Sequence, residues 1–336
     1  MKCGKANLCH YVPLLLLFLL STLIVCPSWS ATVTLAGKFD LQSALSSASA
    51  QPAESLNGQF WHLLRVMADQ AWQVTTGKED ITIAVLDTGI DEAHPALTGK
   101  VIANINFTTS MTAADRNGHG THIAGIIAGK TNQSGPGLAP GSTLMNVKVA
   151  NDDGSVSTEA VVKGIRWATD NGANIINISL SIDKPSVALE EAVDYAWQRG
   201  AIVVTAAGNA YAHHPTYPAF YSSTISVVAT DYEDNITPWS NRGDWVDVSA
   251  PGAYIYSTAP RNTWSSRSGT SMAAALVSAE AALLFSIASD MNGNGKINDE
   301  VRQAIQVSCD GIGDNDVNHG RINVFRAIDF LSSGSL

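Results

Sequence analysis

Short apolar runs alternate with amphipathic helix patterns along the middle of this 336-residue chain, and no other feature constrains its fold as strongly. The runs are rich in Ile, Val and Leu, as is typical of strands that are buried on both faces. Strands separated by helices pair in parallel, and the helices cover both faces of the sheet. The sequence therefore predicts an α/β fold with three layers, in which a mostly parallel twisted sheet lies between helices. The predicted strands are 81–86, 144–149, 175–180, 201–206 and 225–230, and the predicted helices are 121–129, 157–171 and 185–199.

The beginning of the chain has the organisation of a signal peptide. A basic start and a Leu-rich apolar core precede small residues that permit cleavage after Ser30. The next stretch is rich in Ala, Ser and Gln and shows little periodicity. The predicted organisation is a signal peptide over 1–30, a linker or short pro-segment over 31–57 and one domain over 58–336.

This signal peptide predicts a secreted protein, either extracellular or periplasmic. Cys26 closes a stretch similar to a bacterial lipidation box, so lipid anchoring at Cys26 is the alternative. Association with a membrane would then depend on an uncleaved or lipidated N-terminus. The net charge of −10, with no block of like charge, argues against nucleic acid as a partner. No predicted strand is followed by the glycine-rich loop that binds phosphate in nucleotide-binding sheets.

Three side chains with complementary chemistry stand at the ends of predicted elements. Asp87 directly follows the first strand, at the carboxyl edge where parallel sheets bind ligands. His119 lies between two glycines near the start of a predicted helix, and Ser271 precedes a small-residue run that predicts a buried helix over 273–288. A carboxylate, an imidazole and a hydroxyl can act together in nucleophilic catalysis. Taken singly, Asp87 also fits a turn, Ser271 a helix cap, and His119 with His122 a pair of metal ligands.

Asn209 follows the predicted strand 201–206 and is a fourth candidate. An amide side chain at this edge can donate a hydrogen bond to an oxyanion as it develops. An Asn after Gly208 also fits a simple turn, so the position by itself does not decide between the two interpretations.

Four phrases match the motifs of one family: Val85-Leu-Asp-Thr-Gly89, His119-Gly-Thr-His-Ile-Ala-Gly125, Ala206-Ala-Gly-Asn209 and Gly269-Thr-Ser-Met-Ala273. Over residues 58–331 the chain resembles the subtilisin-like (subtilase) serine peptidases, with the same order of Asp, His and Ser. The resemblance implies that Asp87 orients His119 and that His119 takes the proton of Ser271. It also implies that Asn209 and the backbone N–H of Ser271 stabilise the oxyanion.

The same resemblance implies where a peptide or protein substrate binds. We expect three parts of the chain to contact the substrate. One segment lines the primary specificity pocket, an edge pairs with the extended substrate, and another segment forms the opposite wall of the pocket. The pocket walls carry no charge, so apolar residues before the scissile bond should be preferred. The substrate-binding residues implied are Ser179, Leu180 and Ser181 for the pocket segment, Gly154 and Ser155 for the edge, and Ala207 and Gly208 for the opposite wall.

The stretch 290–301 resembles the start of a calcium-binding EF-hand loop. Oxygen-bearing side chains fall at the first, third, fifth and ninth positions, but Val301 stands where the loop requires an acid. The alternative is a helix start, with Asn298 as the cap. We expect that the chemistry needs no cofactor. The pattern in this loop is compatible with a structural calcium ion. Its candidate ligands are Asp290, Asn292, Asn294 and Asn298.

The sequence thus predicts an exported subtilisin-like serine endopeptidase that cleaves peptide bonds through an acyl-enzyme. Two alternatives stay open: a dedicated peptidase that processes one precursor, and a peptide-binding relative without catalytic activity.

Overall fold

The computed structural model describes residues 33–35, 56–130, 136–314 and 316–334. Its largest sheet has seven strands, all parallel, in the order β3-β4-β2-β5-β7-β8-β9. The predicted parallel sheet is therefore confirmed. Its strands are β2 (Thr82–Asp87), β3 (Val101–Asn106), β4 (Thr143–Lys148), β5 (Ile175–Ile178), β7 (Ile202–Ala206), β8 (Thr224–Thr230) and β9 (Val248–Pro251).

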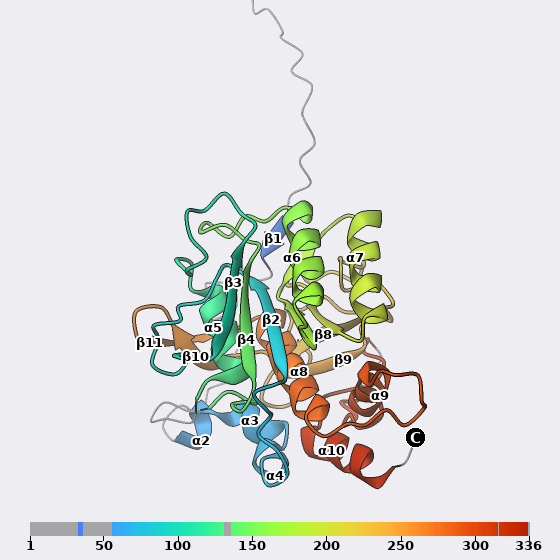
Figure 1. Cartoon of the computed structure of the whole chain (residues 1–336). Coiled ribbons are helices and arrows are strands. Elements are labelled where there is room, and N and C mark those ends of the chain that lie inside the picture. Colours follow the sequence, from blue (N-terminus) through green and yellow to red (C-terminus); the bar gives the residue numbers. More distant parts are fainter. Residues whose placement is uncertain (1–32, 36–55, 131–135, 315, 335–336) are drawn as a thin grey trace, which may run out of the picture. The chain divides into compact units, whose positions relative to one another are not determined.

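Helices cover both faces of this sheet, because a strand turns alternate side chains to opposite sides. In β2, Ile83 and Val85 belong to one hydrophobic core with residues of α5 and α8, whereas Ala84 and Leu86 belong to another with residues of α6 and α7. Figure 1 shows α6 and α7 side by side. The three-layer prediction is thus confirmed. The four helices are α5 (His119–Ala128), α6 (Thr158–Asp170), α7 (Val187–Gln198) and α8 (Thr270–Phe285).

The helix boundaries follow the local capping chemistry. Ser157 caps α6 as predicted, and its side chain accepts a hydrogen bond from the Ala160 N–H at 3.2 Å. The cap of α7 is Ser186, so this helix begins later than its predicted start at residue 185. Helix α5 begins at His119 rather than at residue 121, which places the histidine in the first helical turn.

Helix α8 is buried along its whole length, including its first residue Thr270. Its many alanines allow strands and helices to approach closely on every side. The helix starts earlier than the predicted run 273–288 because Thr270 and Ser271 already belong to its first turn. Hydrogen bonds join this first turn to the ends of β5 and β7, at the carboxyl edge of the sheet.

The predicted strand 175–180 is divided in the structure into β5 and a short strand β6 (Leu180–Ile182), with Ser179 between them. β6 leaves the large sheet and pairs antiparallel with β1 (Val33–Leu35), which lies within the predicted linker or pro-segment. Leu35 is opposite Leu180 in this register. The segment that is predicted to line the specificity pocket therefore accepts an added strand along β6.

Several elements were not predicted from the sequence. A two-stranded hairpin packs against α5, and short helices precede β2 and end the chain. No helix in the described part of the chain is long and apolar enough to cross a membrane. The predicted signal peptide lies outside the described residues. The additional elements are β3, β9, β10 (Ile255–Ala259), β11 (Thr263–Arg267), α2 (Leu56–Gln59), α3 (Trp61–Arg65), α4 (Ala68–Ala71) and α10 (Val324–Ser333). Helix α9 (Asn298–Val307) begins where a helix start was predicted.

Candidate active site

Asp87 and His119 form a buried pair at the carboxyl edge of the sheet. Asp87 is the last residue of β2, and His119 is the first residue of α5. The Nδ1 atom of His119 lies 2.8 Å from Oδ1 and 2.9 Å from Oδ2 of Asp87. Thr88 donates its backbone N–H to Oδ1 of the same carboxylate at 2.7 Å, which fixes the plane of the acceptor.

This contact determines which nitrogen of His119 is basic. An ionised carboxylate can only accept hydrogen bonds, so the proton of a neutral imidazole is on Nδ1 and the lone pair is on Nε2. The Nε2 atom is buried and has no hydrogen-bond partner among the described residues. The pair can therefore present an oriented base. Its accepting nitrogen, Nε2 of His119, forms no hydrogen bond with any other described residue.

Asp115, which the sequence analysis did not single out, holds the backbone around this histidine. Its Oδ1 accepts the Thr88 hydroxyl and the N–H groups of Asn117 and Gly118, at 2.8 to 3.0 Å. Its Oδ2 accepts the N–H and the hydroxyl of Thr121, at 2.9 and 2.6 Å. Five donors thus converge on one carboxylate at the helix N-terminus, where negative charge is favoured. The sequence signal that could have identified Asp115 is its position shortly before the Gly118-His119-Gly120 motif.

Gly120 allows α5 to approach β2 closely enough for the Asp87–His119 contact. A Cβ atom at this position would lie 2.1 Å from the carbonyl oxygen of Gly89 and 3.0 Å from Cβ of Asp87. Since backbone cannot move aside at such distances, only glycine fits here.

Ser271 lies in the first turn of α8 and is fully buried. Its hydroxyl donates to the carbonyl oxygen of Ser179 at 3.2 Å, and the Ser179 hydroxyl donates to the carbonyl oxygen of Ser271 at 3.1 Å. Asn177 extends this contact, because its amide donates to the Ser179 hydroxyl and accepts from Ser278 in α8. A buried polar chain therefore joins β5 to α8 around the predicted nucleophile, although the sequence analysis did not identify Asn177 or Ser278.

Asn209 lies against the same helix start. Its Oδ1 accepts the backbone N–H of Thr270 at 2.9 Å and the Thr270 hydroxyl at 3.1 Å. With the oxygen held in this way, the NH₂ group is the end of the amide that faces away from Thr270. The arrangement fits a hydrogen-bond donor beside Ser271 better than an isolated turn residue.

The two predicted pocket walls meet at this point. Gly208 donates its backbone N–H to the Thr270 hydroxyl at 3.1 Å, while Ser179 contacts Ser271 from the other wall. Ala207 is fully buried, and its carbonyl oxygen accepts hydrogen bonds from Asn241 and Thr216. The structure thus brings both walls to the start of α8, and the residues that line them carry no charge.

The comparison with known protein families agrees with this geometry. A family model described as the Subtilase family matches residues 78–321. The chain belongs to the subtilase family. It is accordingly a serine-type endopeptidase.

Known relatives of this subtilase cover most of the domain. Thermitase of Thermoactinomyces vulgaris is 41% identical over 271 residues, which are 79% of this chain and 94% of thermitase. The thermophilic serine proteinase of Bacillus sp. (strain AK1) is 42% identical over 267 residues, which are 78% of this chain and 65% of that protein. Subtilisin DY of Bacillus licheniformis is 39% identical over 241 residues, which are 70% of this chain and 85% of subtilisin DY.

The predicted substrate edge of this subtilase is a tight turn, with Ala150 and Val156 bridged across it. Gly154 occupies the left-handed region with φ of +84°, and Ser155 donates to Asp153 from both its N–H and its hydroxyl. The turn places Gly154 and Ser155 on a loop that runs beside the strand ends.

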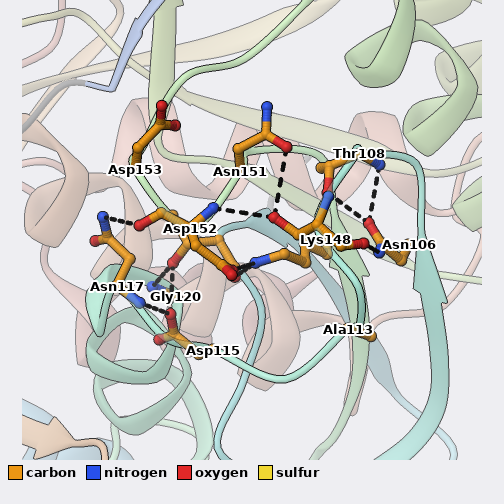
Figure 2. Close-up of polar contacts among 12 residues, drawn as sticks. Asn106, Thr108, Ala113, Asp115, Asn117, Gly120, Lys148, Asn151, Asp152 and Asp153 are labelled. Atoms are coloured by element: carbon orange, nitrogen blue, oxygen red, sulfur yellow. Dashed lines mark hydrogen bonds and ion pairs between the residues drawn. The ribbon is translucent and has the colours of Figure 1, made fainter.

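A buried lysine ties this loop to β2 (Figure 2). The Nζ atom of Lys148 donates to Asp152 at 2.9 Å and to the carbonyl oxygen of Thr88. Asn117, two residues before His119, donates from its side chain to the carbonyl oxygen of Asp152 at 3.3 Å. The substrate edge and the histidine loop of this subtilase are therefore coupled through a shared polar network.

His122 does not join His119 as a metal ligand in the described structure. Its Nε2 lies 3.1 Å from the carbonyl oxygen of Ser265, whereas the imidazole of His119 is turned to Asp87. Burial lowers the pKa of His122 to about 3, so this side chain is neutral. Among the described residues, no group of three or more His, Cys, Asp or Glu side chains is placed to hold a metal ion.

The predicted calcium loop adopts a compact turn in this subtilase. Asp290 accepts the N–H groups of Gly293 and Asn294 on Oδ1 and that of Gly295 on Oδ2, at 2.7 to 3.2 Å. Asn298 is the first residue of α9, and its side chain donates to the carbonyl oxygen of Trp197. Its amide is thus used outside the loop. A helix begins at Asn298 as predicted, but the predicted cap is wrong, because Ile297 is the cap residue and the Asn298 side chain is turned to Trp197.

Two acids that the sequence analysis did not select as ligands face this loop. Asp299 accepts the side-chain N–H groups of Asn292 and Asn294, at 2.6 and 2.7 Å. Glu300 is 1% exposed; its Oε1 accepts the N–H of Met291 at 3.1 Å, whereas its Oε2 is buried without a partner among the described residues. Oδ1 of Asp299 is buried without a partner among the described residues as well, so two buried acceptors beside the loop remain unsatisfied.

Proposed function

We propose that this subtilase hydrolyses peptide bonds by acyl transfer to Ser271. His119 takes the hydroxyl proton through Nε2 as the oxygen attacks the scissile carbonyl, and Asp87 stabilises the imidazolium that forms. Asn209 and the backbone N–H of Ser271 donate to the oxyanion. His119 then gives the proton to the leaving amine, and water releases the acyl-enzyme.

The observation that carries this proposal is the 2.8 Å contact between Asp87 and His119, with Nε2 of the same imidazole unengaged. It supports the role of a general base because it assigns the accepting lone pair to the nitrogen that points away from the carboxylate. The position of Ser271 in the first turn of α8 supports the role of nucleophile, since unpaired backbone N–H groups gather there.

Labelling with a fluorophosphonate probe tests the proposal and its non-catalytic alternative together. The wild-type protein should be labelled at Ser271, and Ser271→Ala should be neither labelled nor active. A protein that folds normally, binds peptides and resists labelling would instead be a peptide-binding relative.

For the substrate, we propose an extended peptide that adds as a strand along Ser179, Leu180 and Ser181. The antiparallel pairing of β1 with β6 supports this mode of binding. The uncharged walls support a preference for apolar residues before the scissile bond, where burial of such a side chain contributes about 1.5–3 kcal/mol. A peptide library that shows a strict requirement for Arg or Lys at this position would contradict the preference.

We propose a degradative role rather than the processing of one precursor, because the walls carry no charged group that would select a single sequence. Casein digestion separates the two roles. Many cleavage sites in casein are expected, whereas a processing peptidase would leave casein largely intact.

Export is part of the proposal and rests on residues 1–30 of the sequence. Mass spectrometry of the mature N-terminus tests it. Cleavage after Ser30 supports a secreted protein, and a lipid-modified Cys26 would support the anchored alternative.

We also propose that the loop 290–300 binds calcium with a structural effect. Asp290, Asn292 and Asn294 offer hard oxygen atoms, and the unpartnered Oε2 of Glu300 offers a further carboxylate oxygen. Because two of these four side chains are neutral amides, the affinity for calcium should be low. Calcium would then contribute to stability and not to the acyl transfer.

A further inference from the structure

Arg267 ends β11, in the hairpin that is fastened to α5. Thr258 donates from its hydroxyl to the carbonyl oxygen of Thr121 at 2.7 Å, and His122 donates from Nε2 to the carbonyl oxygen of Ser265 at 3.1 Å. These bonds hold the hairpin against the first turns of the helix that begins with the catalytic imidazole.

The guanidinium group of Arg267 lies against the backbone beside His119. Its Nη2 atom is 3.0 Å from the point that a Cβ atom would occupy on Gly118, the residue before His119. Gly118 has φ of +92° and no side chain, so nothing separates the cation from this backbone.

No hydrogen bond or ion pair engages the Arg267 side chain within the described part of the chain, although the residue is half-buried. Burial lowers the pKa of Arg267, and the charges of Asp115 and Asp87 oppose that shift. Asp115 already accepts five closer donors and Asp87 accepts Thr88 and His119, and neither carboxylate forms an ion pair with Arg267 within the described residues. The five N–H donors of the guanidinium group therefore remain available for a ligand.

The residues around Ser271 indicate which side of the site binds each half of the substrate. Ser179 and Gly208 contact the start of α8 on the side proposed for the acyl half of the substrate. His119 protonates the leaving amine, so the residues after the scissile bond must lie on the side of His119. Gly118 and Arg267 are on this side.

We propose that Arg267 binds a carboxylate on the leaving-group side of the substrate, within the first two residues after the scissile bond. The inference rests on the proposed peptidase function and adds a specificity to it. A planar guanidinium group matches the two oxygens of a carboxylate, and a partly buried position strengthens this contact. The carboxylate has two sources, the side chain of Asp or Glu and the free C-terminus of a short substrate.

The test uses internally quenched peptides that share one acyl half and differ only after the scissile bond. The first set of pairs compares Glu with Gln, at the first and then at the second position after the scissile bond. The second set compares a free C-terminal carboxylate with a C-terminal amide at the same positions. Wild-type protein should prefer the carboxylate member of at least one pair by roughly tenfold in kcat/KM, as for a charge-assisted hydrogen bond. Preference within the first set identifies an acidic side chain as the ligand, and preference within the second set identifies a terminus.

Variants of Arg267 assign the preference to this side chain. Arg267→Leu should abolish it, Arg267→Lys should retain part of it, and Arg267→Glu should reverse it, with the Gln peptide cleaved faster than the Glu peptide. Arg166→Leu on α6 makes the same charge change at an exposed position and should keep the wild-type preference. Equal kcat/KM for both members of every pair in wild-type protein, or a preference that survives Arg267→Leu, would overturn the inference.

A peptide p-nitroanilide separates this inference from the proposed function, since no residue follows its scissile bond. Arg267→Leu should reduce cleavage of the Glu peptide far more than cleavage of the anilide. Equal reductions would show that Arg267 acts through the Asp87–His119 pair, which contradicts the inference. If wild-type protein neither cleaves the anilide nor reacts with a fluorophosphonate, the proposed function itself fails.

Discussion

Ser179 and Ser271 exchange hydrogen bonds between side chain and backbone, at 3.1 and 3.2 Å. Each hydroxyl donates to the carbonyl oxygen of the other residue, so the proposed pocket wall and the proposed nucleophile are held by the same two bonds. A displacement of β5 or β6 would therefore move Ser271 as well. Ser179 is the single residue between β5 and β6, so these bonds are made at the point where the chain leaves the large sheet.

Removal of the nucleophile and removal of the oxyanion donor should have different kinetic effects. Ser271→Ala should eliminate burst acylation and lower kcat by several orders of magnitude. Asn209→Ala should lower kcat by roughly 10²–10³ with little change in KM, because the oxyanion exists only near the transition state. Steady-state kinetics on an anilide substrate measures both effects. Similar losses in kcat and in substrate affinity for Asn209→Ala would indicate a structural asparagine.

Asp115→Asn should destabilise the start of α5. The substitution removes the charge and replaces one acceptor oxygen by a donor, so at least two of the five donors lose their partner. The expected loss is about 2–4 kcal/mol in the free energy of unfolding, together with a lower kcat. Urea unfolding in a Ser271→Ala background, where autolysis is absent, measures the stability. Asp80→Asn at an exposed position is the control, and an equal, small effect of both substitutions would argue against this role of Asp115.

Glu280 in α8 should make the protein less stable as pH rises. The side chain is fully buried, neither carboxyl oxygen has a partner among the described residues, and burial raises the pKa of Glu280 well above its usual value. Above about pH 4.5 the unfolded chain releases this proton while the folded chain retains it. The folded state then binds more protons, so stability falls by up to about 1.4 kcal/mol per pH unit until the folded pKa is reached.

Glu280→Gln removes this dependence without removing the polar group. The variant should gain stability relative to wild type at pH 8 and show little difference at pH 4, as measured by thermal unfolding in the Ser271→Ala background. Glu191→Gln at an exposed position of α7 is the matched control. A gain of the same size at both pH values would point to packing and not to ionisation.

Calcium should raise the unfolding temperature through the loop that begins at Asp290. Millimolar CaCl₂ is expected to stabilise the protein by mass action, and Asp290→Asn and Glu300→Gln should each reduce the increase. Differential scanning calorimetry with and without a chelator measures the effect, and MgCl₂ controls for ionic strength. An increase that survives both substitutions would assign the effect to another part of the molecule.

Residues 31–57 should not be required for folding. This segment has few large apolar residues and is too short to form a core of its own. Chains that start at Ala31 and at Asn57 should therefore recover comparable numbers of active sites after refolding, counted by fluorophosphonate labelling. Recovery only with residues 31–57 attached would show that the segment assists folding despite its size.

Much of the fold could be predicted because its strands are apolar on both faces and its helices have caps. Ile175–Ile178 and the helix that follows Ser157 were both recognised from such local signals. The division at Ser179 could not be predicted in this way, because Leu180 and Ile182 continue the apolar pattern while their pairing partner, Val33–Leu35, is far away in the sequence. Hairpin β10–β11 was missed because it has polar residues on its exposed side.

The candidate site shows the same limit. Asp87 stands directly after one predicted strand and Asn209 shortly after another, so their placement at one edge follows from the topology of a parallel sheet. Asp115 and Arg267 stand in loops or at a hairpin end, where no periodicity indicates direction. Their roles depend on which backbone groups the chain brings towards them, and this is determined by tertiary packing.

The strand β1 has a consequence for the kinetics of the whole chain. Val33–Leu35 fills the edge of β6 on which we propose that a peptide binds. This competitor is covalently attached, so its effective concentration at the edge does not fall when the protein is diluted. As long as the segment remains, a peptide can bind only to the fraction of molecules in which β1 has detached, and its apparent Kd is raised by the same factor. Cleavage of the chain between β1 and α2 would end the covalent attachment of β1. The released segment could then dissociate from β6 and diffuse away.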